Sequence, residues 1–278
     1  MKILVTGAAG MIGSALVSGL ADAGYEVIGV DRREGNDERV DYAVLDLADK
    51  DALSKLVSAS GADRIIHLAA LAHTAGESDL SYDRYYHVNV ECARNVFEAA
   101  GERPVLFIST VDVFGFTKGT VTVDTEPKPV TAYGKTKALA EAECKSICKG
   151  YTIFRLSPVY TPSVKRDVQK RYYLKYPSWA YIIGKGAEYE VLNIELAVSK
   201  MVEWCATDAD NRIHIIKDDA PLNTAEYITR ERAEGRARRV LRVPRWLAVF
   251  GFAVLRALTG RNKYTYLLNK AVYPLRTE

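Results

Sequence analysis

The sequence predicts an α/β fold, a doubly wound parallel sheet followed by a small, mostly helical C-terminal lobe. Three observations predict it. Short apolar runs alternate with longer helical patterns from residue 1 to about residue 160, as in repeated βαβ units. A glycine-rich turn separates the first apolar run from the first helical pattern. The chain has 278 residues, 48% of them apolar, so it can bury a substantial core without disulfides or metal.

The first half of the chain is predicted as alternating strands and helices. Residues 2–6 form a buried apolar strand, and residues 12–23 carry apolar side chains at helical spacing before Gly24 ends the helix. The same patterns predict further strands at 25–30, 64–68, 105–109 and 151–156, and helices at 50–58, 85–100 and 132–149.

The pattern changes after residue 160. Residues 161–185 contain prolines, aromatic residues and many cations, which predicts an irregular lobe over the strand ends. A short strand followed by a helix is predicted at 190–204, and another strand at 213–216. From residue 218 onward we expect mostly helix, interrupted by Pro221, Pro244 and Gly260.

Charge and cysteine content exclude several classes of protein. The formal net charge is +3, too small to favour nucleic acid as a partner. The four cysteines show no disulfide framework and no CxxC pair, which indicates a reducing compartment. No long apolar stretch with a cleavage site follows Met1, so we expect no secretory signal and a cytoplasmic location.

The turn between the first strand and the first helix has the features of a phosphate-binding turn. Gly7, Gly10 and Gly13 are spaced GxxGxxG rather than GxGxxG. Glycine allows a tight turn, lets the backbone approach a pyrophosphate and permits close helix–strand packing. The backbone at Met11 and Ile12, at the positive end of the helix dipole, would face the phosphates. The order strand, turn, helix therefore predicts a Rossmann-type domain that binds a dinucleotide.

An acid at the end of the second strand strengthens that prediction. Asp31 lies 18 residues beyond the last of these glycines, near the ~20-residue offset at which a carboxylate accepts hydrogen bonds from adenosine ribose. Asp31 favours NAD, but Arg32 and Arg33 could pair with a 2′-phosphate, so NADP stays open. We interpret Asp46 and Leu47 as a carboxylate and a backbone amide at the adenine edge, with a helix N-cap at Asp46 as the alternative.

A tyrosine and a lysine one helical turn apart form a candidate catalytic pair. Tyr133 and Lys137 occupy positions i and i+4 of the helix predicted from residue 132. A tyrosine pKa of ~10 must fall by about three units, or about 4 kcal/mol, for acid–base catalysis near neutral pH. An adjacent ammonium supplies part of that stabilisation, and the positive ring of an oxidised nicotinamide supplies more. For this motif alone, a surface pair without a catalytic role is the alternative.

Two hydroxyls lie about two dozen residues before this tyrosine. Ser109 and Thr110 follow the strand predicted at 105–109, at the carboxyl end where ligands bind in open α/β sheets. Thr110 can therefore share a hydrogen bond from the substrate oxygen with Tyr133 and steady a developing alkoxide.

Together these motifs resemble the extended short-chain dehydrogenase/reductases, also called the NAD-dependent epimerase/dehydratase family. The resemblance covers about the first 200 residues and follows the family's order through Thr6 to Gly13, His67 to His73, Asn89-Val90, Ser109-Thr110, and Tyr133 with Lys137. It implies hydride transfer between a nicotinamide and a carbinol carbon, with Thr110, Tyr133 and Lys137 as catalytic residues. It also implies cofactor contacts at Leu68, Ala69, Ala70, Asn89, Tyr133, Lys137 and Pro158.

Within this family the motifs look most like those of nucleotide-sugar 4-epimerases. Such enzymes oxidise the C4 hydroxyl transiently, turn the 4-keto sugar over and return the hydride to its other face. The resemblance thus implies an NAD(P)-dependent UDP-sugar 4-epimerase, and a homodimer formed through the helices at 85–100 and 132–149. The alternatives are a nucleotide-4-keto-sugar reductase, a membrane-associated non-sugar carbonyl or alcohol oxidoreductase, and a non-catalytic dinucleotide-sensing scaffold.

The sequence departs from the family pattern at two places. Dehydratases of the family carry an acidic pair where this chain has Val111 and Asp112, so we do not expect dehydration. Pro158 replaces an asparagine that binds the substrate phosphate in many relatives. The cationic, aromatic segment 165–175 is the predicted substitute, with a solvated loop as the alternative. Substrate contacts are predicted at Ser109, Thr110, Asp112, Tyr160 and Arg171.

These assignments divide the chain into two domains. Residues 1–160 plus 190–216 are predicted to form the NAD(P)-binding Rossmann domain, and residues 161–189 plus 217–278 the substrate-binding lobe.

The remaining motifs are interpreted as structural. Residues 246–255 are an apolar run of ten residues, well short of the ~20 that span a bilayer. We expect a core-facing or partner-facing helix there, with an interfacial helix on anionic lipid as the alternative. His67 is interpreted as a core histidine, and Cys144 with Cys148 as a buried helical pair. We expect no metal site.

Overall fold

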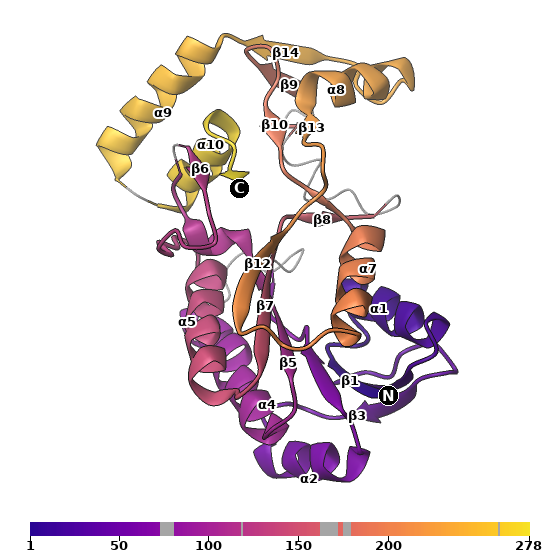
Figure 1. Cartoon of the computed structure of the whole chain (residues 1–278). Coiled ribbons are helices and arrows are strands. Elements are labelled where there is room, and N and C mark those ends of the chain that lie inside the picture. Colours follow the sequence, from indigo (N-terminus) through magenta and orange to yellow (C-terminus); the bar gives the residue numbers. More distant parts are fainter. Residues whose placement is uncertain (73–80, 118, 162–171, 175–178, 261) are drawn as a thin grey trace. The chain divides into compact units, whose positions relative to one another are not determined.

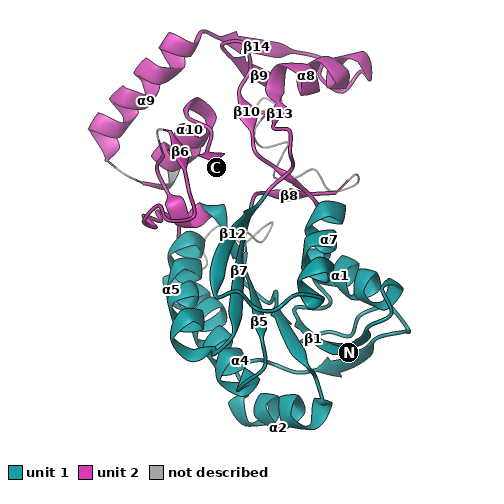
Figure 2. Ribbon diagram, in the orientation of Figure 1, with its two compact units in different colours: residues 1–111, 132–156, 194–216 teal, residues 112–131, 157–193, 217–278 magenta. Residues whose placement is uncertain are grey.

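A computed structural model gives the fold of the chain (Figure 1). It describes residues 1–278 except 73–80, 118, 162–171, 175–178 and 261. The described residues form two compact units that alternate along the sequence (Figure 2). Unit 1 comprises residues 1–111, 132–156 and 194–216, and unit 2 comprises residues 112–131, 157–193 and 217–278.

Unit 1 is built on a seven-stranded parallel sheet, which confirms the predicted Rossmann-type architecture. The strands, in spatial order, are β12 (Arg212–Ile216), β7 (Tyr151–Leu156), β5 (Val105–Thr110), β4 (Arg64–His67), β1 (Lys2–Thr6), β2 (Glu26–Asp31) and β3 (Asp41–Val44). From β1 the chain first moves outward to β3 and then returns to β4 on the other side. The carboxyl ends of β1 and β4 therefore flank the switch point at which open α/β sheets bind ligands.

Helices cover both faces of this sheet (Figure 2). On one face α1 (Met11–Asp22) packs against α7 (Ile194–Cys205). On the other, α4 (Cys92–Ala100) packs between α2 (Lys50–Ser60) and α5 (Ala132–Ile147). Apolar side chains of this second layer and of the strands form the main buried cluster, which includes Leu4, Val30, Leu53, Ile65, Val96, Phe97, Phe107 and Cys144. Their burial is the main stabilising contribution to the sheet that positions the site.

The single helix predicted at 85–100 is interrupted in the structure. It consists of α3 (Tyr82–Tyr86), a π-helical turn (His87–Glu91) and α4. The π turn carries Asn89, whose side chain is buried and bonded to other segments. Sequence periodicity does not reveal the wider turn, because the flanking residues keep the ordinary helical spacing.

Unit 2 contains four two-stranded sheets as well as helices. Its strands are β6 (Thr120–Val121), β8 (Val159–Tyr160), β9 (Ala180–Ile183), β10 (Glu188–Tyr189), β11 (Leu192–Asn193), β13 (Leu222–Asn223), β14 (Val240–Val243) and β15 (Arg276–Thr277). Its helices include α8 (Thr224–Ala233), α9 (Arg245–Thr259) and α10 (Lys263–Val272). The mostly helical prediction after residue 218 was therefore wrong at β13, β14 and β15. These strands are short, and each is fixed by a partner distant in sequence rather than by its own pattern.

The compact units and the predicted domains have different boundaries. Residues 112–131, 157–160 and 190–193, assigned from the sequence to the Rossmann domain, lie in unit 2. The reason is strand pairing, because β6 pairs with β15 at the end of the chain, and β8 pairs with β11. Local patterns do not show which distant strand completes such a pair.

Candidate active site

The glycine turn brings the end of β1, the start of α1 and the end of β4 into close contact. Gly7 has a φ of +75°, and its N–H donates to the Val30 carbonyl oxygen at 2.8 Å. A Cβ on Gly7 would lie 2.7 Å from the Ala69 nitrogen, and one on Gly13 only 2.0 Å from the Gly7 oxygen. Both positions therefore require glycine, and the turn leaves a cradle without side chains where a pyrophosphate would lie.

The other residues predicted to contact the cofactor lie next to this turn in the sequence or in space. Gly10 precedes α1, whose first residues are Met11 and Ile12, and Met11 is exposed. The Leu68 N–H donates to the Thr6 oxygen at 3.2 Å. The chain after β4, at Leu68, Ala69 and Ala70, thus runs beside the turn, as a segment that contacts the same ligand must.

Asp31, at the end of β2, is tied to the same turn. Its carboxylate accepts hydrogen bonds from the Ala9 N–H at 3.1 Å and the Arg33 N–H at 3.2 Å. The Arg33 guanidinium approaches the Ala9 oxygen at 3.5 Å, and Arg32 beside it is exposed. A cavity of about 810 Å³ opens next to Ala9, lined also by Ser14, Ser18, Arg39 and Tyr42. Asp31, Arg33 and this cavity thus lie beside the glycine turn, and the adenosine contacts expected there remain predictions.

The alternative reading of Asp46 as a helix N-cap is wrong. Asp49 caps α2, accepting a hydrogen bond from the Ala52 N–H at 3.0 Å, whereas Asp46 accepts one from the Ala48 N–H. Leu47 is buried, and its carbonyl oxygen accepts a hydrogen bond from Asn95 at 2.9 Å. The sequence alone did not identify the N-cap, because Asp46 and Asp49 both lie within the four residues before α2.

Lys137 is buried on α5, with only 1% of its surface exposed. Its Nζ lies 3.9 Å from the centroid of the Phe107 ring on β5, a cation–π contact. Burial lowers the pKa of Lys137 to about 7, although the nearby Glu141 carboxylate acts in the opposite direction. The amine is therefore close to its titration point at neutral pH, which is typical of groups at catalytic sites.

Tyr133 lies one turn before Lys137 on the same face of α5, and Thr110 ends β5. Both side chains are partly exposed, unlike Lys137. Unit 1 thus contains all three predicted catalytic residues together with the glycine turn.

Asn89 holds the helix turn that carries Tyr133. Its amide nitrogen donates to Thr136 Oγ1 at 3.0 Å and to the Leu71 oxygen at 3.1 Å, and its amide oxygen accepts from the Leu71 N–H at 2.7 Å. The resemblance implies direct cofactor contact by Asn89. In the structure both amide hydrogens are used within the protein, so Asn89 connects the chain after β4 to α5.

His67 is a core histidine, as predicted. It is 1% exposed, its Nδ1 lies 2.6 Å from Thr6 Oγ1, and its ring stacks on Phe107 at 5.6 Å. Burial, with a smaller contribution from the Lys137 charge, lowers its pKa to about 3. His67 is therefore neutral at physiological pH and supports the ring on which Lys137 lies.

Ser109 is hydrogen-bonded within the protein. It is buried, and its hydroxyl donates to Glu141 Oε1 at 2.5 Å. Glu141 also accepts two hydrogen bonds from Arg155, from Nε at 3.0 Å and from a terminal nitrogen at 2.8 Å. The Ser109 hydroxyl thus meets a buried ion pair, and the substrate contact at Ser109 remains a prediction. Glu141 and Arg155 were missed, although Glu141 lies one turn beyond Lys137 on the same helix face.

Of the other predicted substrate residues, Thr110 ends β5 in unit 1, whereas Asp112 and Tyr160 lie in unit 2 and Arg171 lies outside the described residues. Asp112 Oδ1 accepts hydrogen bonds from Lys270 Nζ at 2.6 Å and from the Tyr266 hydroxyl at 3.4 Å. The Tyr160 hydroxyl donates to Asp218 at 3.1 Å, and the Pro158 oxygen accepts from the Leu192 N–H. Arg171 and most of segment 165–175 lie outside the described residues.

The cysteines and potential metal ligands add no second centre to the described part of the chain. Cys92, Cys144, Cys148 and Cys205 are buried free thiols, with 3.9 Å between the sulfurs of Cys144 and Cys148. The predicted buried pair is thus confirmed. Across the described residues, no group of three or more His, Cys, Asp or Glu side chains is placed to hold a metal ion.

The fold and the turn define a dinucleotide-binding protein of the Rossmann type. A family model, the NAD dependent epimerase/dehydratase family, matches residues 3–218. The chain belongs to that family.

Individual relatives agree with this assignment. The chain is 31% identical over 191 residues to a Bacillus subtilis protein described as an uncharacterized UDP-glucose epimerase, YtcB, which covers 60% of each chain. It is also 31% identical over 167 residues to UDP-glucose 4-epimerase 2 of Arabidopsis thaliana, covering 52% of this chain and 47% of the relative. The chain therefore matches only about half to three fifths of these relatives' length.

Solved structures resemble the whole fold. The UDP-glucuronic acid 4-epimerase of Bacillus cereus in complex with NAD has a TM-score of 0.72 at 25% identity, over 88% of this chain and 87% of that one. MoeE5 in complex with UDP-glucose and NAD has a TM-score of 0.71 at 22% identity, over 100% and 88% of the two chains. The second likeness supports the fold alone.

Proposed function

We propose that the protein is an NAD-dependent UDP-sugar 4-epimerase that acts through a transient 4-keto sugar. The observation that carries this proposal is the burial of Lys137 on Phe107, one turn from Tyr133, in the unit that contains the glycine turn. The Bacillus cereus epimerase structure, which contains NAD, supports the choice of cofactor. Asp31, bonded to the turn, supports NAD over NADP.

The residues of this chain fit such a cofactor. The cradle at Gly7 and Gly13 would take the pyrophosphate, Asp31 the adenosine ribose, and Tyr133 with Lys137 the nicotinamide ribose end. When bound, NAD supplies a hydride acceptor at the nicotinamide that can return the hydride.

The chemistry of the protein itself is proton transfer. Tyr133, whose phenolate the Lys137 ammonium stabilises, takes the proton from the C4 hydroxyl and later returns it to the same oxygen, while C4 itself accepts hydrogen on its opposite face. Thr110 donates a hydrogen bond to the same oxygen. Asp112, the lone acid after Thr110, is engaged by Lys270, which supports epimerisation over loss of water.

Turnover of UDP-sugars tests the proposal. Purified protein with NAD is incubated with UDP-glucose, UDP-N-acetylglucosamine or UDP-glucuronic acid, and the sugar protons are followed by NMR. We expect interconversion of C4 epimers without accumulation of NADH. Stoichiometric consumption of NADH or NADPH with a 4-keto sugar, and no epimerisation, would show a reductase instead.

We also propose a homodimer formed through the helices at 82–100 and 132–147. The support is two large side chains left exposed on them, Tyr82 and Leu139. Sedimentation equilibrium tests this proposal, since Leu139→Glu is expected to shift the protein toward the monomer. The buried free thiols support a cytoplasmic location.

A further inference from the structure

The helix α9 presents a continuous apolar face to solvent. Trp246, Phe250, Val254 and Leu258 recur every four residues along it and are 70%, 62%, 41% and 79% exposed. Between them on the same side of the helix lie Leu247, Gly251, Ala253 and Ala257, all exposed. The face therefore carries no polar side chain along the whole helix. Exposed apolar areas of this kind usually mark an interaction site.

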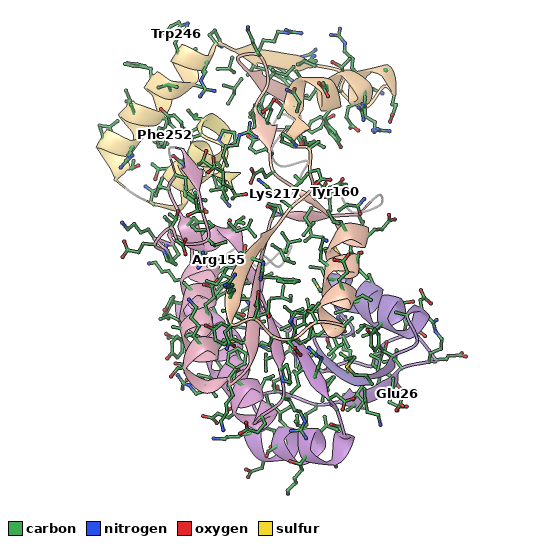
Figure 3. The ribbon with its side chains drawn as sticks, viewed as in Figure 1. Glu26, Arg155, Tyr160, Lys217, Trp246 and Phe252 are labelled. Atoms are coloured by element: carbon green, nitrogen blue, oxygen red, sulfur yellow. The ribbon has the colours of Figure 1, made fainter. Side chains whose placement is uncertain are left out.

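The opposite face of α9 holds the helix in unit 2. Phe252 is 3% exposed, and its ring lies 5.8 Å from that of Tyr273 after α10. The Arg256 guanidinium lies 5.7 Å from the Phe116 ring. Figure 3 shows Trp246 at the outer end of the helix, with Phe252 further along it. The exposed apolar face is thus not needed for packing within the described part of unit 2.

The charge around this face has one sign. From Gly235 to Thr277 the sequence contains ten lysine or arginine residues and no aspartate or glutamate. Arg238, Arg242 and Arg245, just before or at the start of α9, are exposed and form no ion pair with any residue that the structure describes. Three of the ten, Arg236, Lys270 and Arg276, pair with carboxylates elsewhere in unit 2. The positive charge beside the apolar face therefore comes mainly from the exposed arginines before α9.

Charge complementarity selects the partner. An isologous contact with a second copy would bring these arginines together with no carboxylate of the segment between them, which is unfavourable. An anionic bilayer offers phosphates to the arginines and an acyl boundary to the apolar face. The helix has 15 residues, about 22 Å, too short for a core of about 30 Å. Within the described residues no helix meets the length and apolarity needed to cross a membrane.

We propose that α9 docks the protein on an anionic membrane surface, lying in the plane of the interface. Trp246 and Phe250 enter at the level of the headgroups, where aromatic rings are favoured, and Arg238, Arg242 and Arg245 contact lipid phosphates. This docking is a property of unit 2 and does not depend on the reaction proposed for unit 1.

Vesicle sedimentation with the full chain tests this docking. We expect the protein to pellet with vesicles of phosphatidylglycerol and phosphatidylcholine, far less with phosphatidylcholine alone, and less at about 0.5 M salt. The double variant Trp246→Gln/Phe250→Gln should lower partitioning at least about tenfold, because it removes the two aromatic anchors. Val44→Gln, which changes an exposed apolar residue on β3 in unit 1, serves as the matched control and should bind as the wild type.

Two further variants separate the apolar and the charged contributions. Arg242→Glu/Arg245→Glu should lower binding to the anionic vesicles, whereas Arg212→Glu, exposed in unit 1, should not. Trp246→Phe keeps the face apolar, so it should still bind but lose the blue shift of tryptophan emission that vesicles cause in the wild type.

Three results would overturn the proposal. They are absence of pelleting with anionic vesicles, equal pelleting of the Trp246→Gln/Phe250→Gln variant, and a wild-type dimer that this variant converts to monomer. The last result would assign the apolar face to a second copy of the chain. Far-UV circular dichroism melts of each variant establish that it folds as the wild type does.

Discussion

The two units are stabilised in different ways. In unit 1 most elements follow the alternating pattern of the sequence, and parallel strands form a sheet that packs against a large apolar cluster. In unit 2 short strands and ion pairs join residues far apart in sequence, such as Asp112 with Lys270 and β6 with β15 (Figure 2). Unit 2 also buries an apolar cluster, which includes Tyr172, Ile182 and Ile228, so the units differ mainly in how far apart in sequence their paired elements lie.

The largest expected effect compares two tyrosines, one in each unit. Tyr133→Phe should lower the epimerisation rate about a thousandfold, because it removes the proton-transfer group. Tyr160→Phe removes one hydrogen bond to Asp218, so we expect a loss of about 1 kcal/mol in stability and less than about a tenfold change in rate. NMR turnover assays measure both rates. Near wild-type activity of Tyr133→Phe would remove the catalytic assignment.

Two buried glutamates give the next comparison. Glu141→Ala should destabilise the protein by about 3–5 kcal/mol, because it leaves the Arg155 guanidinium buried and unpaired. Figure 3 shows Arg155 within the unit 1 sheet region. Glu190 pairs with Lys217 at 3.0 Å and hydrogen-bonds to Thr277. Glu190→Ala should lower the free energy of unfolding by less, about 1–3 kcal/mol, since the Lys217 ammonium can then be hydrated by solvent. Urea unfolding curves decide the order, and a larger loss for Glu190→Ala would contradict it.

Two lysines should respond with opposite signs. The pKa of Lys137 is lowered to about 7, against ~10.4 in an unfolded chain. Below pH 7 folding therefore carries the full cost of a buried ammonium, and this cost disappears as pH rises from 7 towards 10. Lys137→Met should abolish activity yet raise stability at pH 6 by about 2–4 kcal/mol, with a smaller gain at pH 9.

Lys270→Met should instead lower stability by about 1 kcal/mol, because it leaves Asp112, largely buried, without its cation. Thermal unfolding of both variants at pH 6 and pH 9 gives the two signs. A destabilised Lys137→Met protein at pH 6 would refute the argument from burial.

The smallest expected effect concerns acid stability. The described histidines, His67, His87 and His214, all lie in unit 1. The pKa of His67 is lowered to about 3 in the folded protein. As pH falls below about 6.5, His67 is therefore protonated in the unfolded chain but stays neutral in the folded one. Stability should fall by about 1 kcal/mol between pH 6.5 and 5.5 from this residue. Hydrogen exchange should show the loss in unit 1 first, and His67→Gln should remove it while His214→Gln does not.

The sequence predicted the parts of the site that depend on strand ends and helix spacing. The glycine turn, Asp31 and the Tyr133/Lys137 pair lie where the pattern placed them, because a parallel sheet fixes where each strand ends. The orientation of Ser109 and the pairing of Asp112 could not be predicted, because each depends on a charged partner 32 or 158 residues away. The same limit explains the missed strand β14, whose partner is β9.

By itself, the sequence determined the parallel sheet, the glycine turn and the spacing of Tyr133 and Lys137 on one helix, since all three follow from local periodicity and from residue types that tolerate few alternatives. The tertiary structure alone decided how deeply Lys137 is buried, that Glu141 and Arg155 lie behind Ser109, and that one face of α9 is left exposed. Each of these features depends on which segments pack together in the folded chain. That packing sets the free energy of a buried charge and decides whether an apolar helix face stays exposed.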